Sequence, residues 1–127
     1  MSSDYLNYEL SKELHDLGVV FETKLWHMAY RDGTVELTDY ATPLYYKEEW
    51  VGSFPAPSTA RLIDEIQSRC SIQIRRCRTE HTIQGKYAYE IRDLSNDNYW
   101  SGRPLAEDRD ATTALGKALI ALVKEGK

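Results

Sequence analysis

The hydrophobic residues of the first part of the chain recur at helical spacing. Leu6, Leu10, Leu14 and Leu17 are three or four positions apart and predict one apolar helix face. Gly18 follows, where a helix commonly ends in a left-handed conformation. The next stretches, "VVFETKLWHMAY" and "VELTDY", are rich in β-branched and aromatic residues and flank Asp32-Gly33, which predicts a tight turn with positive backbone angles. We therefore expect a helix and then a β-hairpin, roughly residues 19–30 paired with 35–40.

The middle of the chain contains a segment rich in proline and then a second amphipathic pattern. "ATPLYYKEEWVGSFPAP" disfavours a helix and predicts a loop or a short edge strand. In "STARLIDEIQSR", Ser58 or Thr59 is placed to cap a helix. The apolar residues of that helix share one face, as expected for a helix lying on a sheet: Leu62, Ile63, Ile66 and Cys70.

A second hairpin and a closing helix are predicted after that. "SIQIRRCR" and "KYAYEIRDL" alternate in the manner of strands and are joined by "TEHTIQG". "SNDNYWSGRPLAED" is polar and rich in turn residues, so we expect a loop there. Asp110 is placed to cap the final helix, "ATTALGKALIALVKEGK". Its apolar stripe consists of Ala111, Leu115, Ala118, Leu119 and Leu122.

These elements predict an α+β fold in the order α-β-β-α-β-β-α, with an antiparallel sheet built from two β-hairpins and helices packed on it. The 127 residues suffice for one ordinary core, so we expect a single domain over residues 1–127. The pattern leaves open whether the two hairpins form one sheet or two.

Charge and cysteine content narrow the class of protein. The net charge is -4, but residues 61–103 hold 8 basic and 6 acidic residues, which makes that segment +2 and the rest -6. There are 2 cysteines, no secretory leader pattern and no apolar run of the roughly 20 residues that cross a bilayer. We expect a cytoplasmic protein with no membrane contact.

The patterns that support catalysis or cofactor binding are missing. Cys70, Cys77 and His81 lack the closely spaced ligand pair of a structural zinc site, and Cys70 falls on an apolar helix face as a small hydrophobe does. His15 and His27 are interpreted as structural or surface histidines. No glycine-rich phosphate loop or nucleophile elbow is present. We expect no enzyme activity, no metal site and no cofactor.

Two groups of residues are candidates for binding. In "IRRCR", Arg75 and Arg76 point to opposite faces of a strand. Their charge either blocks strand-to-strand aggregation, or an arginine of this region, Arg76, Arg78 or Arg92, contacts an anion or nucleotide. Aromatic residues in predicted loops either cover the core or form a recognition surface: Tyr45, Tyr46, Trp50, Tyr99 and Trp100.

The blocks "FPAPSTARLIDEIQSR", "IQIRR", "YAYEIRDL" and "ATTALGKALIALVKEG" resemble small uncharacterised proteins of phages, prophages and gut bacteria over residues 53–126. Those proteins place a proline-bracketed start before a helix, then a hairpin with a tyrosine-rich strand, then a closing helix built on an AL repeat. The resemblance implies a phage or mobile-element accessory protein and no mechanism.

The outline of helix, antiparallel strands and closing helix also resembles a double-stranded-RNA-binding domain. Such domains open the closing helix with lysines, whereas "EDRDATTALGK" begins with acids, so we do not expect nucleic-acid binding. The leading hypothesis is a non-enzymatic accessory protein that self-associates and binds a host or phage protein through its aromatic loops. The alternative is a protein that sequesters a nucleotide or other small anion.

Overall fold

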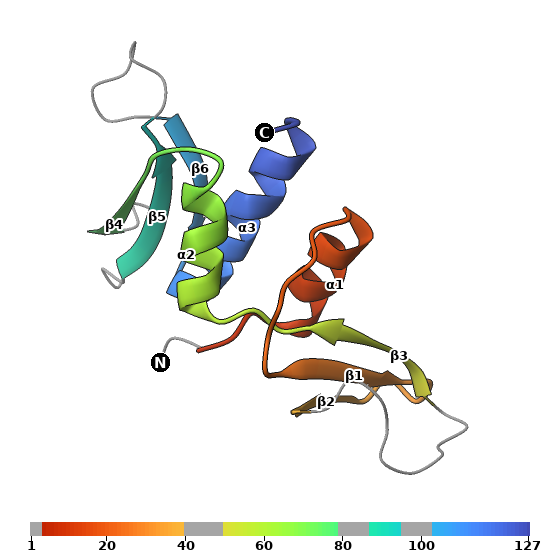
Figure 1. Ribbon diagram of the computed structural model, residues 1–127. Helices are drawn as coiled ribbons and strands as arrows, with labels where there is room; N and C mark the ends of the chain where they lie inside the picture. Colours follow the sequence, from red (N-terminus) through yellow and green to blue (C-terminus); the bar gives the residue numbers. More distant parts are fainter. Residues whose placement is uncertain (1–3, 40–49, 79–86, 95–102) are drawn as a thin grey trace. The chain divides into compact units, whose positions relative to one another are not determined.

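The computed structural model describes residues 4–39, 50–78, 87–94 and 103–127, without the side chains of Cys77, Arg78 and Tyr87. Within these ranges the chain is a mixed α+β protein (Figure 1). Its elements are α1 (Tyr8–Asp16), β1 (Trp26–Tyr30), β2 (Val35–Thr38), β3 (Trp50–Pro55), α2 (Thr59–Gln67), β4 (Ile72–Arg78), β5 (Tyr87–Asp93), β6 (Arg103–Asp108) and α3 (Ala111–Lys124). The α+β class is confirmed, but the order is α-β-β-β-α-β-β-β-α, with one more strand in each half than the sequence predicted.

The chain divides into two compact units. Tyr5–Ser58 form the N-terminal unit, and Met1–Asp4 with Thr59–Lys127 form the C-terminal unit. Each unit has its own three-stranded antiparallel sheet, β2-β1-β3 in the first and β4-β5-β6 in the second. The question that the sequence left open is thereby answered, because the two hairpins belong to separate sheets.

In the N-terminal unit, α1 packs against β3 (Figure 1). The helix begins after Asn7, whose side-chain oxygen accepts a hydrogen bond of 2.9 Å from the backbone N–H of Leu10. Leu6 and Leu14 are buried, and Gly18 adopts a φ of 87° just past the end of the helix. The glycine stop is confirmed, whereas the predicted leucine face is buried only in part, because Leu10 is half-buried and Leu17 is 37% exposed.

The turn between β1 and β2 differs from the predicted one. Gly33 has a φ of 88°, whereas no other residue type in the described ranges has a positive φ, so Asp32 does not take the left-handed conformation. Instead, the Asp32 carboxylate accepts a hydrogen bond of 2.9 Å from the backbone N–H of Thr34. The backbone N–H of Tyr30 bonds the oxygen of Thr34, which closes a three-residue loop with glycine at its last position.

β3 is the short edge strand that the proline-rich segment allowed. It pairs antiparallel with β1, with Phe54 opposite His27 and Gly52 opposite Ala29, and its register shifts between Ala29 and Tyr30. Residue 40, the last of the predicted hairpin strand, and residues 41–49 of the predicted loop lie outside the described ranges.

In the C-terminal unit, α3 lies on β5 and β6, and α2 packs against α3 (Figure 1). The sequence predicted α2 directly on a sheet, but its main packing partner is the closing helix. Contact on two sides explains why the buried face of α3 is wider than the predicted stripe: Thr112, Ala114, Leu115, Gly116, Ala118, Leu119, Ile120 and Leu122. Leu62 and Ile66 of α2 are fully buried, which confirms the apolar face of that helix.

β6 occupies a stretch that the sequence predicted as a loop. It pairs with β5, with Ala106 opposite Ile91 and Arg103 opposite Asp93. Its sequence, "RPLAED", has a proline and three charged residues and therefore lacks the alternation of a half-buried strand. Because β6 lies at the sheet edge, where proline and charge are tolerated, pairing with β5 determines its conformation.

Candidate interaction surfaces

Two of the arginines predicted as anion contacts, Arg76 and Arg92, lie in the C-terminal sheet with described side chains. Arg76 of β4 is opposite Tyr89 of β5, whereas Arg92 of β5 is opposite Gln73. Paired residues share a face and successive residues alternate, so Arg76 and Arg92 lie on different faces. The side chain of Arg78 lies outside the described part of the structure.

Arg92 is held by a neighbour on its own strand. One guanidinium nitrogen donates a hydrogen bond of 2.6 Å to the Glu90 carboxylate, and the side-chain exposures are 15% and 17%. An opposite charge at this distance compensates much of the attraction that the arginine offers to an anion. Arg76 and Arg92 therefore do not converge on a single anion site.

Only one of the five predicted aromatic binding residues lies in the described ranges. Trp50 begins β3 and is 38% exposed, and its neighbour Val51 is 65% exposed. Tyr45, Tyr46, Tyr99 and Trp100 lie outside those ranges.

The other edge strand of the same sheet carries apolar side chains that the sequence analysis did not single out. Val35 and Leu37 of β2 are 41% and 46% exposed. They are two positions apart and therefore share one face, which we call the β2 shelf. Leu37 is opposite His27, and Val35 is opposite Ala29. Alternating apolar residues in "VEL" are the sequence signal for this face, but only the sheet order shows that it lies on an edge.

The interior of that sheet face is covered by α1. The ring of Tyr8 lies 6.1 Å from the ring of His27 and 5.8 Å from that of Phe54, and the His15 ring lies 5.1 Å from Phe54. His27 Nε2 donates a hydrogen bond of 2.6 Å to the main-chain oxygen of Leu6, and burial lowers the pKa of His27. His27 is thus a structural histidine. α1 covers this face of the sheet at His27 and Phe54, whereas the β2 shelf on the same face is exposed.

β4 is an edge strand of different character. It forms an unbroken antiparallel register with β5 from Ile72 to Arg78 and has no acidic residue. Ile74 is 42% exposed, and Arg75 and Arg76 are also exposed. Ile74 and Arg76 lie on the face that contains the buried Ile91, while Arg75 lies on the opposite face, across from Glu90. The edge therefore presents positive charge on both faces.

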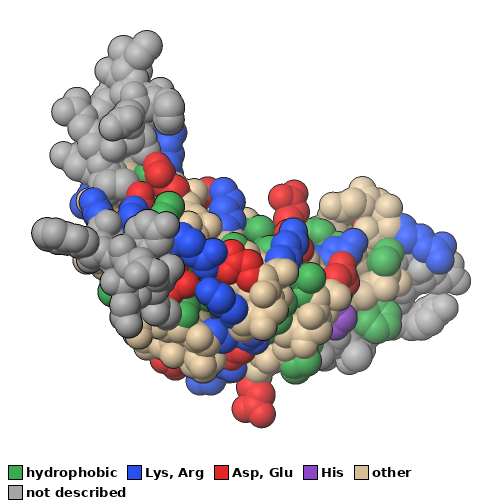
Figure 2. Space-filling model, turned by 90° about the horizontal axis from the view of Figure 1, so that it is seen from above, with side chains coloured by type: hydrophobic (Ala, Val, Ile, Leu, Met, Phe, Trp, Pro, Cys, Tyr) green, Lys and Arg blue, Asp and Glu red, His purple; other side chains and the backbone are tan. Residues whose placement is uncertain are grey.

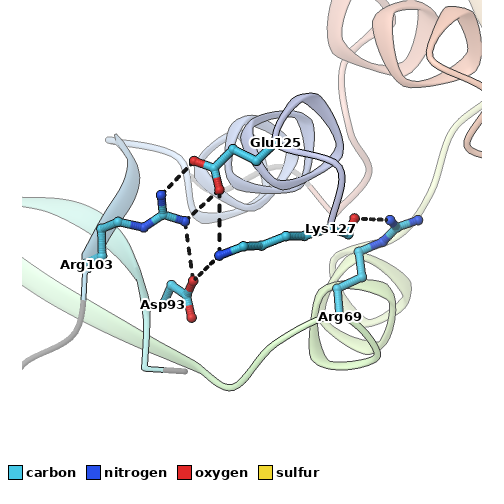
Figure 3. Close-up of polar contacts among 5 residues, drawn as sticks. All are labelled: Arg69, Asp93, Arg103, Glu125 and Lys127. Atoms are coloured by element: carbon cyan, nitrogen blue, oxygen red, sulfur yellow. Dashed lines mark hydrogen bonds and ion pairs between the residues drawn. The ribbon is translucent and has the colours of Figure 1, made fainter. Parts of the chain in front are cut away.

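A cluster of charged residues joins three elements at one end of the C-terminal unit (Figure 3). Arg103 of β6 makes two hydrogen bonds of 2.7 Å to the Glu125 carboxylate, which raises the pKa of Arg103 and lowers that of Glu125. Asp93 of β5 is only 2% exposed and lies 3.4 Å from the Arg103 guanidinium and 3.6 Å from Lys127 Nζ. Each of these charges faces an opposite one, so the cluster links β5, β6 and the end of α3 rather than offering an open site.

The start of α3 is acidic, as the sequence indicated. The Asp110 carboxylate accepts hydrogen bonds from the Thr113 backbone N–H at 2.9 Å and from its hydroxyl at 2.7 Å, which confirms the predicted cap. Lys117 Nζ lies 2.7 Å from Asp108. Burial alone would raise the pKa of Asp108, but the Lys117 contact and backbone hydrogen bonds lower it overall. The helix start therefore presents carboxylates where an RNA phosphate would need cations.

The described residues contain no group of three or more histidine, cysteine or carboxylate side chains placed to hold a metal ion. Cys70, predicted as a small buried hydrophobe, is only half-buried after the end of α2. Within the same ranges no helix has the length and apolarity to cross a membrane. Acidic and basic side chains are intermingled over the face shown in Figure 2.

Comparison with known proteins gives no functional lead. No family model, no curated protein and no solved structure matches the chain.

Proposed function

We propose that this chain is a non-enzymatic accessory protein that acts by protein–protein interaction and self-associates. Its setting in a phage or mobile element rests on the resemblance described above, and its cytoplasmic location rests on its low cysteine content. The interaction function rests on the N-terminal sheet, and on the side chains that its edge strands expose.

One observation carries this proposal. Four of the exposed large apolar residues lie on the two edge strands of one small sheet, Val35 and Leu37 on β2 and Trp50 and Val51 on β3. Edge strands of soluble proteins normally carry charge or proline, because an apolar edge pairs with other chains. Apolar groups gathered at such an edge are typical of a surface that another protein covers.

A second copy of this chain is the occupant that fits the β2 shelf. If two copies of β2 pair antiparallel about Leu37, Leu37 meets Leu37 of the other copy and Glu36 meets Thr38, so no like charges oppose each other. The same operation on β4 about Arg75 would set arginine against arginine. Since a four-residue strand buries little area, we expect a weak, concentration-dependent dimer.

The opposite edge, β3, stays available in such a dimer. Trp50, the one described residue of the predicted aromatic surface, lies there beside the exposed Val51. Tryptophan is enriched at the centres of protein interfaces because it buries a large area with little loss of conformational freedom. We assign the host or phage protein to this edge.

The test is sedimentation equilibrium of the full chain and of two lysine variants. Leu37→Lys puts like charges opposite each other in the dimer and should weaken it by about tenfold or more. Val20→Lys is the matched control, because Val20 is 78% exposed in the same unit and lies on no strand. A monomeric wild type, or equal dimerisation of both variants, would contradict self-association through β2.

The alternative, capture of a nucleotide or other anion, has less support. Of the arginines predicted as anion contacts, Arg92 lies on the face opposite to Arg76 and is bonded to Glu90.

A further inference from the structure

The edge of the C-terminal sheet formed by β4 combines three properties that the proposed self-association does not use. It is a seven-residue strand in regular register with β5. Among the described residues, no strand pairs with its other side. It has an exposed isoleucine, and its sequence contains three arginines and no acidic residue. An open edge of this kind is a template for strand addition by an extended peptide.

The arginines determine which strands can be added. A second copy of β4 is disfavoured, because antiparallel pairing about Arg75 places Arg75 against its counterpart and Ile74 against Arg76. The carboxylate nearest in register, Glu90 opposite Arg75, already accepts a hydrogen bond of 2.6 Å from Arg92. An incoming acidic strand would therefore supply Arg75 with a negative charge, since the sheet's own Glu90 is bonded to Arg92.

We propose that β4 binds an extended, acidic segment of a partner protein by β-strand addition. Because Arg75 and Arg76 point to opposite faces, the segment needs two adjacent acids, which an extended strand also directs to opposite faces. An apolar residue is needed opposite Ile74. In antiparallel pairing the recognised order, from the amino end, is acid, acid, apolar.

This order distinguishes a peptide from a nucleic acid. A polyanion would bind arginines on one open face, whereas β4 divides Arg75 and Arg76 between two faces at the rim of a sheet. A nucleic acid also cannot continue the β-sheet hydrogen bonding of the backbone N–H and C=O groups at the edge, and it has no apolar side chain to pack on the 42% exposed Ile74. Backbone pairing gives affinity to the strand, and the side-chain pairs give specificity.

The test uses the full chain and a fluorescent peptide, TTEEVTV, whose glutamates face Arg76 and Arg75 and whose first valine faces Ile74. We expect saturable binding that weakens as salt is added. The uncharged peptide TTQQVTV should bind about tenfold more weakly. Of two peptides N-methylated at alternate residues, only the one whose N-methyl groups face β4 should lose binding, because only those amides pair with the strand.

A charge exchange connects the peptide to these arginines. Arg75→Glu with Arg76→Glu should abolish binding of TTEEVTV and create binding of TTKKVTV, which an unfolded variant would not do. Arg109→Glu is the matched control, since Arg109 is an exposed arginine of the same unit outside β4. It should leave binding of TTEEVTV unchanged.

Three results would overturn the proposal: equal binding of TTEEVTV and TTQQVTV, binding that survives both methylation patterns, or competition by a short RNA duplex stronger than by unlabelled peptide. The Leu37→Lys variant distinguishes a failure of the β4 proposal from a failure of the proposed dimer. If that variant is monomeric and still binds TTEEVTV, the β4 site stands alone; if a wild-type dimer ignores the peptide, only the β4 proposal fails.

Discussion

His27 Nε2 lies 2.6 Å from the main-chain oxygen of Leu6, and this hydrogen bond connects the segment just before α1 to the central strand of the N-terminal sheet. His27 is 7% exposed. The ring of Tyr8 packs against its imidazole, and Phe54 is opposite His27 in the sheet. Its protonation is therefore coupled to the stability of this unit.

We predict that the N-terminal unit loses stability as the pH falls below about 6.5. Burial lowers the folded-state pKa of His27 from its ordinary value of 6.5, although the Leu6 hydrogen bond partly opposes the effect. The unfolded chain then binds more protons, so the stability contribution is complete above the unfolded pKa and declines toward the folded pKa. The loss is at most about 1.4 kcal/mol per pH unit.

Urea unfolding at a series of pH values measures this effect. His27→Gln retains a donor for the Leu6 oxygen and should flatten the dependence below pH 6.5. Identical pH curves for the wild type and His27→Gln would contradict the assignment.

We predict that Ile66→Ala lowers the free energy of unfolding by about 2–5 kcal/mol. Ile66 is fully buried on the face of α2 that packs against α3, so the substitution leaves a cavity between the two helices. Ile63→Ala in the same helix removes a half-buried side chain and should cost less. Denaturant unfolding compares the two, and equal midpoints would contradict the packing of α2.

We predict that Asp93→Asn lowers the free energy of unfolding by about 1–3 kcal/mol. The change removes the 2% exposed carboxylate that faces Arg103 and Lys127 and keeps the shape of the side chain. Glu125→Gln removes an acid from the same cluster, but its side chain is 37% exposed and water compensates, so its loss should be smaller. Thermal unfolding at low and high salt provides the comparison; a larger loss for Glu125→Gln would show that Asp93 does not anchor the cluster.

Local signals predicted much of the secondary structure. The leucine spacing of α1, the stop at Gly18, the buried face of α2 and the Asp110 cap each depend on residues within one or two helical turns of each other. β6 was missed because "RPLAED" has no strand pattern of its own and becomes a strand only beside β5.

For the candidate surfaces, too, the sequence identified residue types, and only the structure showed where their side chains lie. The sequence identified Arg76, Arg92 and Trp50 as residues suited to binding but could not tell that Arg76 and Arg92 lie on opposite sheet faces. It also gave no reason to choose Val35 and Leu37 over other apolar residues, because their exposure depends on the position of β2 at the edge of the sheet.

The sequence alone determined the α+β class, the three helices and the two hairpins, because helical and strand periodicity, caps and turn glycines act over a few residues. The tertiary structure decided that there are two sheets, that α2 packs on α3, that two further strands complete the sheets, and which edges are apolar or positively charged. Those features depend on pairings between distant segments, whose energies arise only when backbone hydrogen bonds and buried side chains from both segments meet.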